Sequence, residues 1–146
     1  QQSCVVNVGS TFGSIGYTGF STYCASKFAL RGFSEALRRE LAGTPIRVLY
    51  LAPRATRTEM NGARIEAMNQ ALGVSMDSPE RVAAQLVRAL DRNLREVHLG
   101  WPERLLVRVN GLMPRLLDSA LRRQLPTIQH FAQPENPVTV PSEQQS

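Results

Sequence analysis

Short runs of apolar, β-branched residues predict three buried strands, which cover residues 4–8, 46–51 and 96–100. Glycine or proline stands at or just after the end of each run, as is usual where a strand ends. The segments between the runs are too long for hairpin turns and carry helical patterns. Strands that alternate with helices form a parallel sheet, because a parallel connection needs a long crossover. The pattern therefore predicts an α/β fold with helices packed on both faces of a parallel sheet.

Helical periodicity is clearest over residues 22–42, where large apolar side chains recur every three or four positions between charged ones. Residues 10–21 hold three glycines among serines and threonines, which predicts a loop. A serine N-cap and a proline at the first helical position predict another helix over 78–93. One or two short helices are expected over 58–72. These helices complete the alternation of strand and helix.

Three strands make a thin sheet, and a parallel sheet needs both faces and its edges covered. We therefore expect residues 1–100 to be the C-terminal half of a larger, doubly wound domain. Two apolar, basic helical segments, about 102–110 and 114–131, form a helical C-terminal extension over 101–132 that packs on this domain. Residues 133–146 are rich in proline, glutamine and serine, so we expect them to form a disordered tail.

Composition and charge narrow the functional classes. The chain of 146 residues is 42% hydrophobic, which excludes a fully disordered protein. A formal net charge of +5 is compatible with nucleic-acid binding, but the basic residues alternate with Glu and Leu at helical spacing, as on solvated helix faces. We expect no nucleic-acid partner. The cysteines and histidines have no metal-ligand spacing, so no metal site is expected. With no signal peptide or disulfide framework, a cytoplasmic setting is predicted.

One pair of residues suggests chemistry. The 17 basic residues are all arginine except Lys27, which stands four positions after Tyr23 on one face of the predicted helix. A free tyrosine has a pKa near 10, and a nearby cation favours the phenolate. Ser10 leaves the first strand at the edge where open α/β sheets bind ligands. If the three side chains converge there, they suit proton transfer to or from a carbonyl or alcohol oxygen.

The chain resembles the short-chain dehydrogenase/reductase family over about residues 5–100. The resemblance is carried by VVNVGS at 5–10 and YCASKFAL at 23–30, with serine, tyrosine and lysine at the family's spacing. It implies a partial, Rossmann-like doubly wound sheet, the C-terminal half of the family's catalytic domain. It also implies an NAD(P)-dependent oxidoreductase that interconverts an alcohol and a ketone or aldehyde by hydride transfer.

The same resemblance implies catalytic roles for three residues. Tyr23 would be the general acid/base that protonates the carbonyl oxygen in reduction and deprotonates the alcohol in oxidation. Lys27 would lower the pKa of Tyr23 and hydrogen-bond the nicotinamide ribose of the cofactor. Ser10 would orient the substrate oxygen. Tyr23 and Lys27 therefore count as both catalytic and cofactor-binding residues.

A second stretch, APRATRT at 52–58, is similar to the family's Pro-Gly-x-x-x-Thr sequence. The similarity implies that Pro53 and Thr58 bind the cofactor, with Thr58 at the nicotinamide carboxamide. Arg54 stands where the family usually has glycine, which puts the local turn geometry in doubt. This position is therefore the main departure within the matching region.

The family's glycine-rich dinucleotide turn and the residue that selects NAD or NADP are missing here. Gly13, Gly16 and Gly19 are spaced G-x-x-G-x-x-G and follow the wrong strand. The expected cofactor is NADP or NAD, with NADP favoured. The alternative function is a truncated, catalytically silent fragment that acts only as an interaction or oligomerisation module.

The expected partner is a small, apolar carbonyl or alcohol substrate. The resemblance also implies a homodimer or homotetramer, because family members commonly pack the helices at 22–42 and 78–93 against their copies. Residues 101–131 carry a wide apolar face opposite arginines. In one interpretation this face covers the end of the sheet and closes the substrate cleft. In the other it rests on an anionic membrane surface as a basic amphipathic helix, a peripheral membrane contact.

Overall fold

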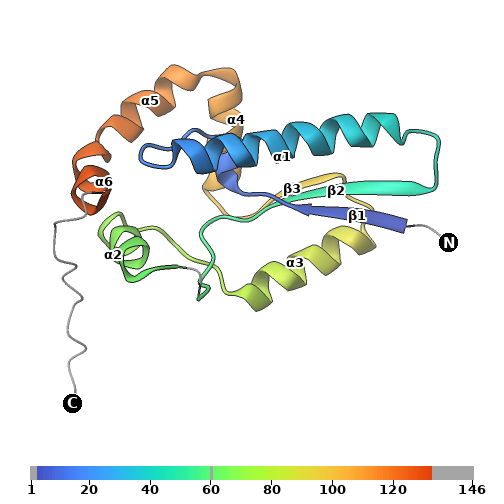
Figure 1. Ribbon diagram of the computed structural model, residues 1–146, viewed down its shortest axis with the longest axis horizontal. Coiled ribbons are helices and arrows are strands. Elements are labelled where there is room, and N and C mark those ends of the chain that lie inside the picture. Colours follow the sequence, from blue (N-terminus) through green and yellow to red (C-terminus); the bar gives the residue numbers. More distant parts are fainter. Residues whose placement is uncertain (1–2, 60, 133–146) are drawn as a thin grey trace, which may run out of the picture.

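The computed structural model describes residues 3–59 and 61–132, which form an α/β structure (Figure 1). The described residues contain a three-stranded sheet in the order β1-β2-β3, with every pair parallel. Its strands are β1 (Ser3–Val8), β2 (Ile46–Ala52) and β3 (Glu96–His98). The helices are η1 (Thr11–Gly13), α1 (Ser21–Glu40), α2 (Ala63–Ala71), α3 (Pro79–Asp91), α4 (Glu103–Leu112), α5 (Pro114–Arg122) and α6 (Leu125–Ala132). The predicted fold class is confirmed.

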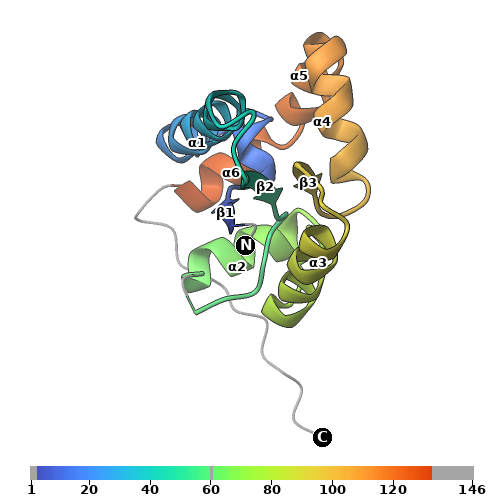
Figure 2. The same ribbon diagram turned by 90° about the vertical axis from the view of Figure 1, so that its right-hand side faces the viewer.

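Helices cover both faces of the sheet, with α1 on one side and α3 on the other (Figures 1 and 2). The register of β1 on β2 runs from Ser3 opposite Ile46 to Val8 opposite Leu51. Strand β2 lies between its two neighbours, and its side chains from Val48 to Ala52 are all buried. The middle strand therefore carries the core, as expected for a continuous apolar run in a parallel sheet.

The C-terminal segment differs from the sequence-based expectation at one point. One helical segment was expected over 114–131, but the structure divides it into α5 and α6, with the break at residues 123–124. Pro126 explains the break. Proline is tolerated in the first turn of a helix, whereas in the interior it removes a hydrogen bond and clashes with the preceding turn. The predicted tail, residues 133–146, lies outside the described residues.

None of the described helices has the length and the apolar character that crossing a membrane requires. The described part of the chain also holds no cluster of three or more histidine, cysteine, aspartate or glutamate side chains arranged for a metal ion.

Candidate active site

Ser10 follows β1 and begins the η1 turn. Its side-chain oxygen accepts a hydrogen bond from the Phe12 backbone N–H at 3.1 Å, and the side chain is half-buried. Serine is a favoured N-cap because its hydroxyl satisfies an N–H that the first turn leaves without a partner. The bond uses the oxygen as an acceptor, so the Ser10 hydroxyl can still donate its proton to another group.

The turn after β1 is tied to the loop after β2. Both the backbone N–H and the side-chain hydroxyl of Thr11 donate to the Pro53 carbonyl, at 2.9 and 3.2 Å. The Gly9 N–H donates to the Leu51 carbonyl at 2.7 Å and extends the pairing of the two strands. Pro53 therefore lies beside the Ser10 turn, at the carboxyl edge of the sheet.

Tyr23 and Lys27 lie in the first two turns of α1. The Lys27 ammonium is 5.5 Å from the centre of the Tyr23 ring, and it donates to the Val8 carbonyl at 3.5 Å. Val8 is the last residue of β1, so the lysine links the start of the helix to the end of the strand that leads to Ser10. Tyr23 is 44% exposed and thus open to a ligand. The structure brings these three predicted residues to one edge of the sheet.

A cluster of aromatic rings follows Ser10 along the chain and includes Tyr23, and sequence reasoning missed it. Phe12 stacks on Tyr17 at a centroid distance of 4.7 Å, and it contacts Phe20 at 5.6 Å and Tyr23 at 6.2 Å. The Tyr17 hydroxyl donates to the Gln124 side chain at 2.8 Å, and burial raises the pKa of Tyr17. The available signal was the density of aromatic residues between the serine and the lysine.

Tyr50 is a second residue that sequence reasoning missed. It is fully buried in the centre of β2, and its hydroxyl donates to the Ser10 carbonyl at 3.4 Å. Burial raises the pKa of Tyr50, so the phenol keeps the proton that it donates. Tyr50 therefore holds the backbone of the Ser10 turn against the sheet. Its signal in the sequence is one tyrosine within the apolar run at the end of β2, residues 48–52.

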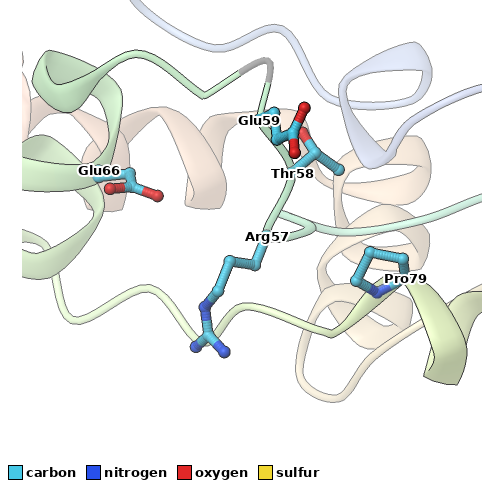
Figure 3. Close-up of a pocket in the computed structure, with 5 residues that line it drawn as sticks. All are labelled: Arg57, Thr58, Glu59, Glu66 and Pro79. Atoms are coloured by element: carbon cyan, nitrogen blue, oxygen red, sulfur yellow. The ribbon is translucent and has the colours of Figure 1, made fainter.

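Thr58 lies farther along the loop after β2. It is exposed and lines an open hollow of about 670 Å³ together with Arg57, Glu59, Glu66 and Pro79 (Figure 3). The Arg57 side chain points away from Thr58 and Glu59 (Figure 3). None of Ser10, Tyr23 and Lys27 lines this hollow. The structure thus joins Pro53 to the Ser10 turn and places Thr58 in a neighbouring depression.

Arg54, the departure from the family's sequence in this loop, has a side chain with a defined place. Arg54 makes two hydrogen bonds with the buried carboxylate of Asp77, at 2.9 and 3.0 Å. The Arg54 guanidinium holds the pKa of that carboxyl below its usual range. The arginine found in place of the family's glycine is therefore an ordered part of the loop.

Comparison with known proteins agrees with this architecture. Residues 1–69 match the family model for short chain dehydrogenases. The uncharacterized oxidoreductase YxnA of Bacillus subtilis is 30% identical over 138 residues, which are 91% of this chain and 39% of that protein. The NADP-dependent 3-hydroxy acid dehydrogenase of Schizosaccharomyces pombe is 38% identical over 93 residues, 60% of this chain and 36% of that protein.

Two solved structures share the fold. A short-chain dehydrogenase from Streptomyces avermitilis has a TM-score of 0.58 at 29% identity, over 86% of this chain and 50% of the other. A short chain dehydrogenase from Burkholderia cenocepacia, in complex with NADP, has a TM-score of 0.65 at 24% identity, over 81% and 46%. The chain thus spans half or less of the length of these relatives. Its sequence matches and its parallel α/β fold show that it belongs to the short-chain dehydrogenase/reductase family.

Proposed function

We propose that the protein containing this chain is an NAD(P)-dependent oxidoreductase that interconverts an alcohol and a ketone or aldehyde by hydride transfer. The observation that carries the proposal is the arrangement at the carboxyl edge of the sheet. There the Lys27 ammonium lies 5.5 Å from the Tyr23 ring and also bonds the end of the strand that leads to Ser10. Proton transfer at a substrate oxygen needs such a set of donors in one place.

Each side chain then has a distinct role. Tyr23 gives a proton to the substrate oxygen in reduction and takes it back in oxidation. The Lys27 charge on the face of the ring stabilises the negative charge that develops when the proton leaves. The Ser10 hydroxyl, whose oxygen is held by the Phe12 N–H, donates to the same substrate oxygen and orients it.

The cofactor would be held by Lys27, Pro53 and Thr58, and it would supply or accept the hydride. The fit rests on the chemistry of two donors: the Lys27 ammonium, at the carboxyl edge of the sheet, suits ribose hydroxyls, and the exposed Thr58 hydroxyl, in the loop after β2, suits a carboxamide. Pro53 fixes the start of the loop through Thr11. We favour NADP over NAD because one relative at 38% identity is an NADP-dependent dehydrogenase.

The substrate would be a small, apolar carbonyl compound or alcohol. The aromatic cluster of Phe12, Tyr17, Phe20 and Tyr23 supports this, because it places apolar ring surface beside the Tyr23 ring. A cytoplasmic location agrees with the free thiols of Cys4 and Cys24.

Exposed apolar side chains on α1 and α3 support the association of this protein with further copies of itself. Phe28 and Phe33 of α1 are 44% and 56% exposed, and Val87 of α3 is 56% exposed. Large apolar side chains at these positions support a homodimer or homotetramer formed through the two helices.

The C-terminal helices support a peripheral contact with an anionic membrane. Trp101 and Leu112 are 72% and 83% exposed, and exposed arginines at 104, 108 and 115 lie between and beside them. Full-length protein should sediment with anionic vesicles at low salt and be released at high salt, because arginine–lipid attraction is screened. Failure to bind at low salt leaves only the interpretation in which these helices cover the cleft.

The test of the main proposal uses the full-length protein with NADPH or NADH and a panel of apolar aldehydes and ketones. Tyr23→Phe should lower turnover by about 100-fold or more, because general acid catalysis contributes at least that much. Ser10→Ala should also lose activity, whereas the matched variant Ser119→Ala, at an exposed position on α5, should keep it. Unchanged turnover in Tyr23→Phe would remove the role of Tyr23. If wild-type protein neither binds nor oxidises either cofactor, the alternative of a silent interaction module is favoured.

A further inference from the structure

Arg54 lies in a nearly closed cluster of charged side chains. Its side chain is 11% exposed, and the Asp77 side chain that it binds is 4% exposed. The arginine Nε and Nη2 donate to the two carboxylate oxygens at 3.0 and 2.9 Å, which is the two-pronged geometry that a guanidinium alone provides. Its third nitrogen, Nη1, faces Glu103 Oε2 at 3.6 Å. One arginine therefore serves two carboxylates, the buried one of Asp77 and the part-buried one of Glu103.

The cluster joins three parts of the chain that are far apart in sequence. Arg54 belongs to the loop after β2, Asp77 precedes α3, and Glu103 is the first residue of α4. Gly100 makes room for it. A Cβ atom at Gly100, where φ is +93°, would lie 2.6 Å from both the Arg54 Cδ and the Glu103 Oε2 atoms. The glycine is thus needed both for the backbone turn and for the approach of the arginine.

The Asp77 backbone holds the same loop. Its N–H donates to the Ala55 carbonyl at 2.9 Å, and its carbonyl accepts from the Arg57 N–H at 2.9 Å. Together with the side-chain bonds to Arg54, these contacts hold three of the four residues from 54 to 57, namely Arg54, Ala55 and Arg57. The next residue is Thr58. These contacts therefore hold the backbone that leads into Thr58.

A buried ion pair adds little net stability, because the free energy of removing both charges from water is about as large as the attraction between them. Apolar side chains would fill the same space at no greater cost. What the charged cluster adds is a defined geometry, since a two-pronged arginine–carboxylate pair fixes both distance and orientation.

We infer that Arg54 is a positioning residue for the cofactor: through Asp77 and Glu103 it fixes the loop over 53–58 so that Thr58 meets the nicotinamide end of NAD(P). The cluster also makes the placement of this loop depend on where α4 begins. The inference rests on the proposed function, because it requires the cofactor to lie against Thr58.

The test measures the dissociation constant for NADPH in the full-length protein, well below its unfolding temperature. Arg54→Gln should raise this constant about tenfold, because it removes the two charged hydrogen bonds to Asp77 that hold the loop before Thr58. Arg54→Lys should raise it less, because the ammonium keeps the charge and loses the two-pronged geometry. Gly100→Ala should raise it as well, by displacing Arg54 without removing any charge. The matched control Arg39→Gln removes an exposed ion pair with Glu35 on α1, and should leave the constant unchanged.

A purely structural cluster gives a different result. In that case Arg54→Gln lowers the unfolding temperature but binds NADPH within twofold of wild type, and the inference is wrong. Should Gly100→Ala fail to fold, Glu103→Gln takes its place, with an expected rise of about threefold because its contact with Arg54 is longer. A wild-type protein that binds neither NADPH nor NADH contradicts the proposed function and this inference with it. Tight binding by wild type and Arg54→Gln alike contradicts this inference alone.

Discussion

At Gly9 and Gly13 the backbone passes so close to the Tyr50 phenol that a side chain has no space. A Cβ atom would lie 2.2 Å from the phenol oxygen at Gly9 and 2.5 Å from it at Gly13. Tyr50 in turn holds the Ser10 carbonyl. At the residue scale, then, two glycines and one buried tyrosine determine how closely the turn that carries the Ser10 hydroxyl packs against β2.

This packing predicts that Gly13→Ala lowers the free energy of unfolding by about 1–3 kcal/mol, as for other overpacked sites. The new methyl group would also meet the Lys27 backbone carbonyl at 2.8 Å, which cannot move aside as a side chain can. Gly16 is the matched control, because a Cβ atom there has no neighbour within 4 Å. Gly16→Ala should stay within about 0.5 kcal/mol of wild type. Urea unfolding of the full-length protein measures both, and equal effects would contradict the packing argument.

At the scale of elements, the start of α3 shows how one short segment serves two purposes. Ser78 caps the helix by accepting from the Arg81 N–H at 3.3 Å, and Pro79 occupies the first helical position. Asp77, immediately before the cap, turns its carboxylate to Arg54. The helix start is therefore also the anchor of the loop after β2.

The ion pair between Asp77 and Arg54 predicts that the stability of the fold depends on pH. Arg54 holds the pKa of the Asp77 carboxyl below its ordinary value of about 3.9. The resulting stabilisation is fully present above that ordinary value and is lost as the pH falls through the lower pKa of the folded state. The difference in unfolding free energy between wild type and Asp77→Asn should therefore shrink between about pH 6 and pH 3. Asp118→Asn, an exposed site on α5, should differ little from wild type at either pH. A constant gap for Asp77→Asn would refute the coupling.

At the scale of the whole molecule, the C-terminal helices lie against the loop that follows Ser10 (Figures 1 and 2). Asn110 of α4 donates to the Ser14 carbonyl at 2.9 Å, and Gln124 accepts from Tyr17. Ile128 of α6 is 2% exposed and approaches Gly19. These contacts bring residues from the two ends of the described chain together around the candidate site.

We predict that Ile128→Ala lowers the free energy of unfolding by about 2–4 kcal/mol, because it empties a buried site. Leu112→Ala is the control within the same C-terminal segment. Leu112 is 83% exposed, so its truncation should change stability by no more than about 0.5 kcal/mol. In limited proteolysis of the two variants, cleavage near Tyr17 should be faster than in wild type only for Ile128→Ala. Equal stability of the two variants would show that α6 does not hold this loop.

Much of the fold could be predicted from local sequence alone. An apolar run predicts β2, a helical period of apolar residues predicts α1, and a proline at the first helical position predicts the start of α3. All three signals depend on residues that are close together in the sequence. The parallel sheet follows from the length of the connections. The break between α5 and α6 was missed, because an apolar period continues across it while Pro126 changes the backbone. The predicted chemistry of Ser10, Tyr23 and Lys27 required a family resemblance as well as spacing.

What the sequence by itself determined is the order and approximate bounds of most strands and helices, and which side chains are candidates for the chemistry. Only the tertiary structure decided that Tyr50 supports Ser10, that Gln124 meets Tyr17, and that Arg54 binds Asp77 and Glu103. The physical reason is that these pairs are separated by 23 to 107 positions along the chain. A hydrophobic period fixes which face of an element is buried, but it does not determine which distant polar group lies opposite that face. The partner of a buried charge or hydroxyl becomes defined when the elements pack.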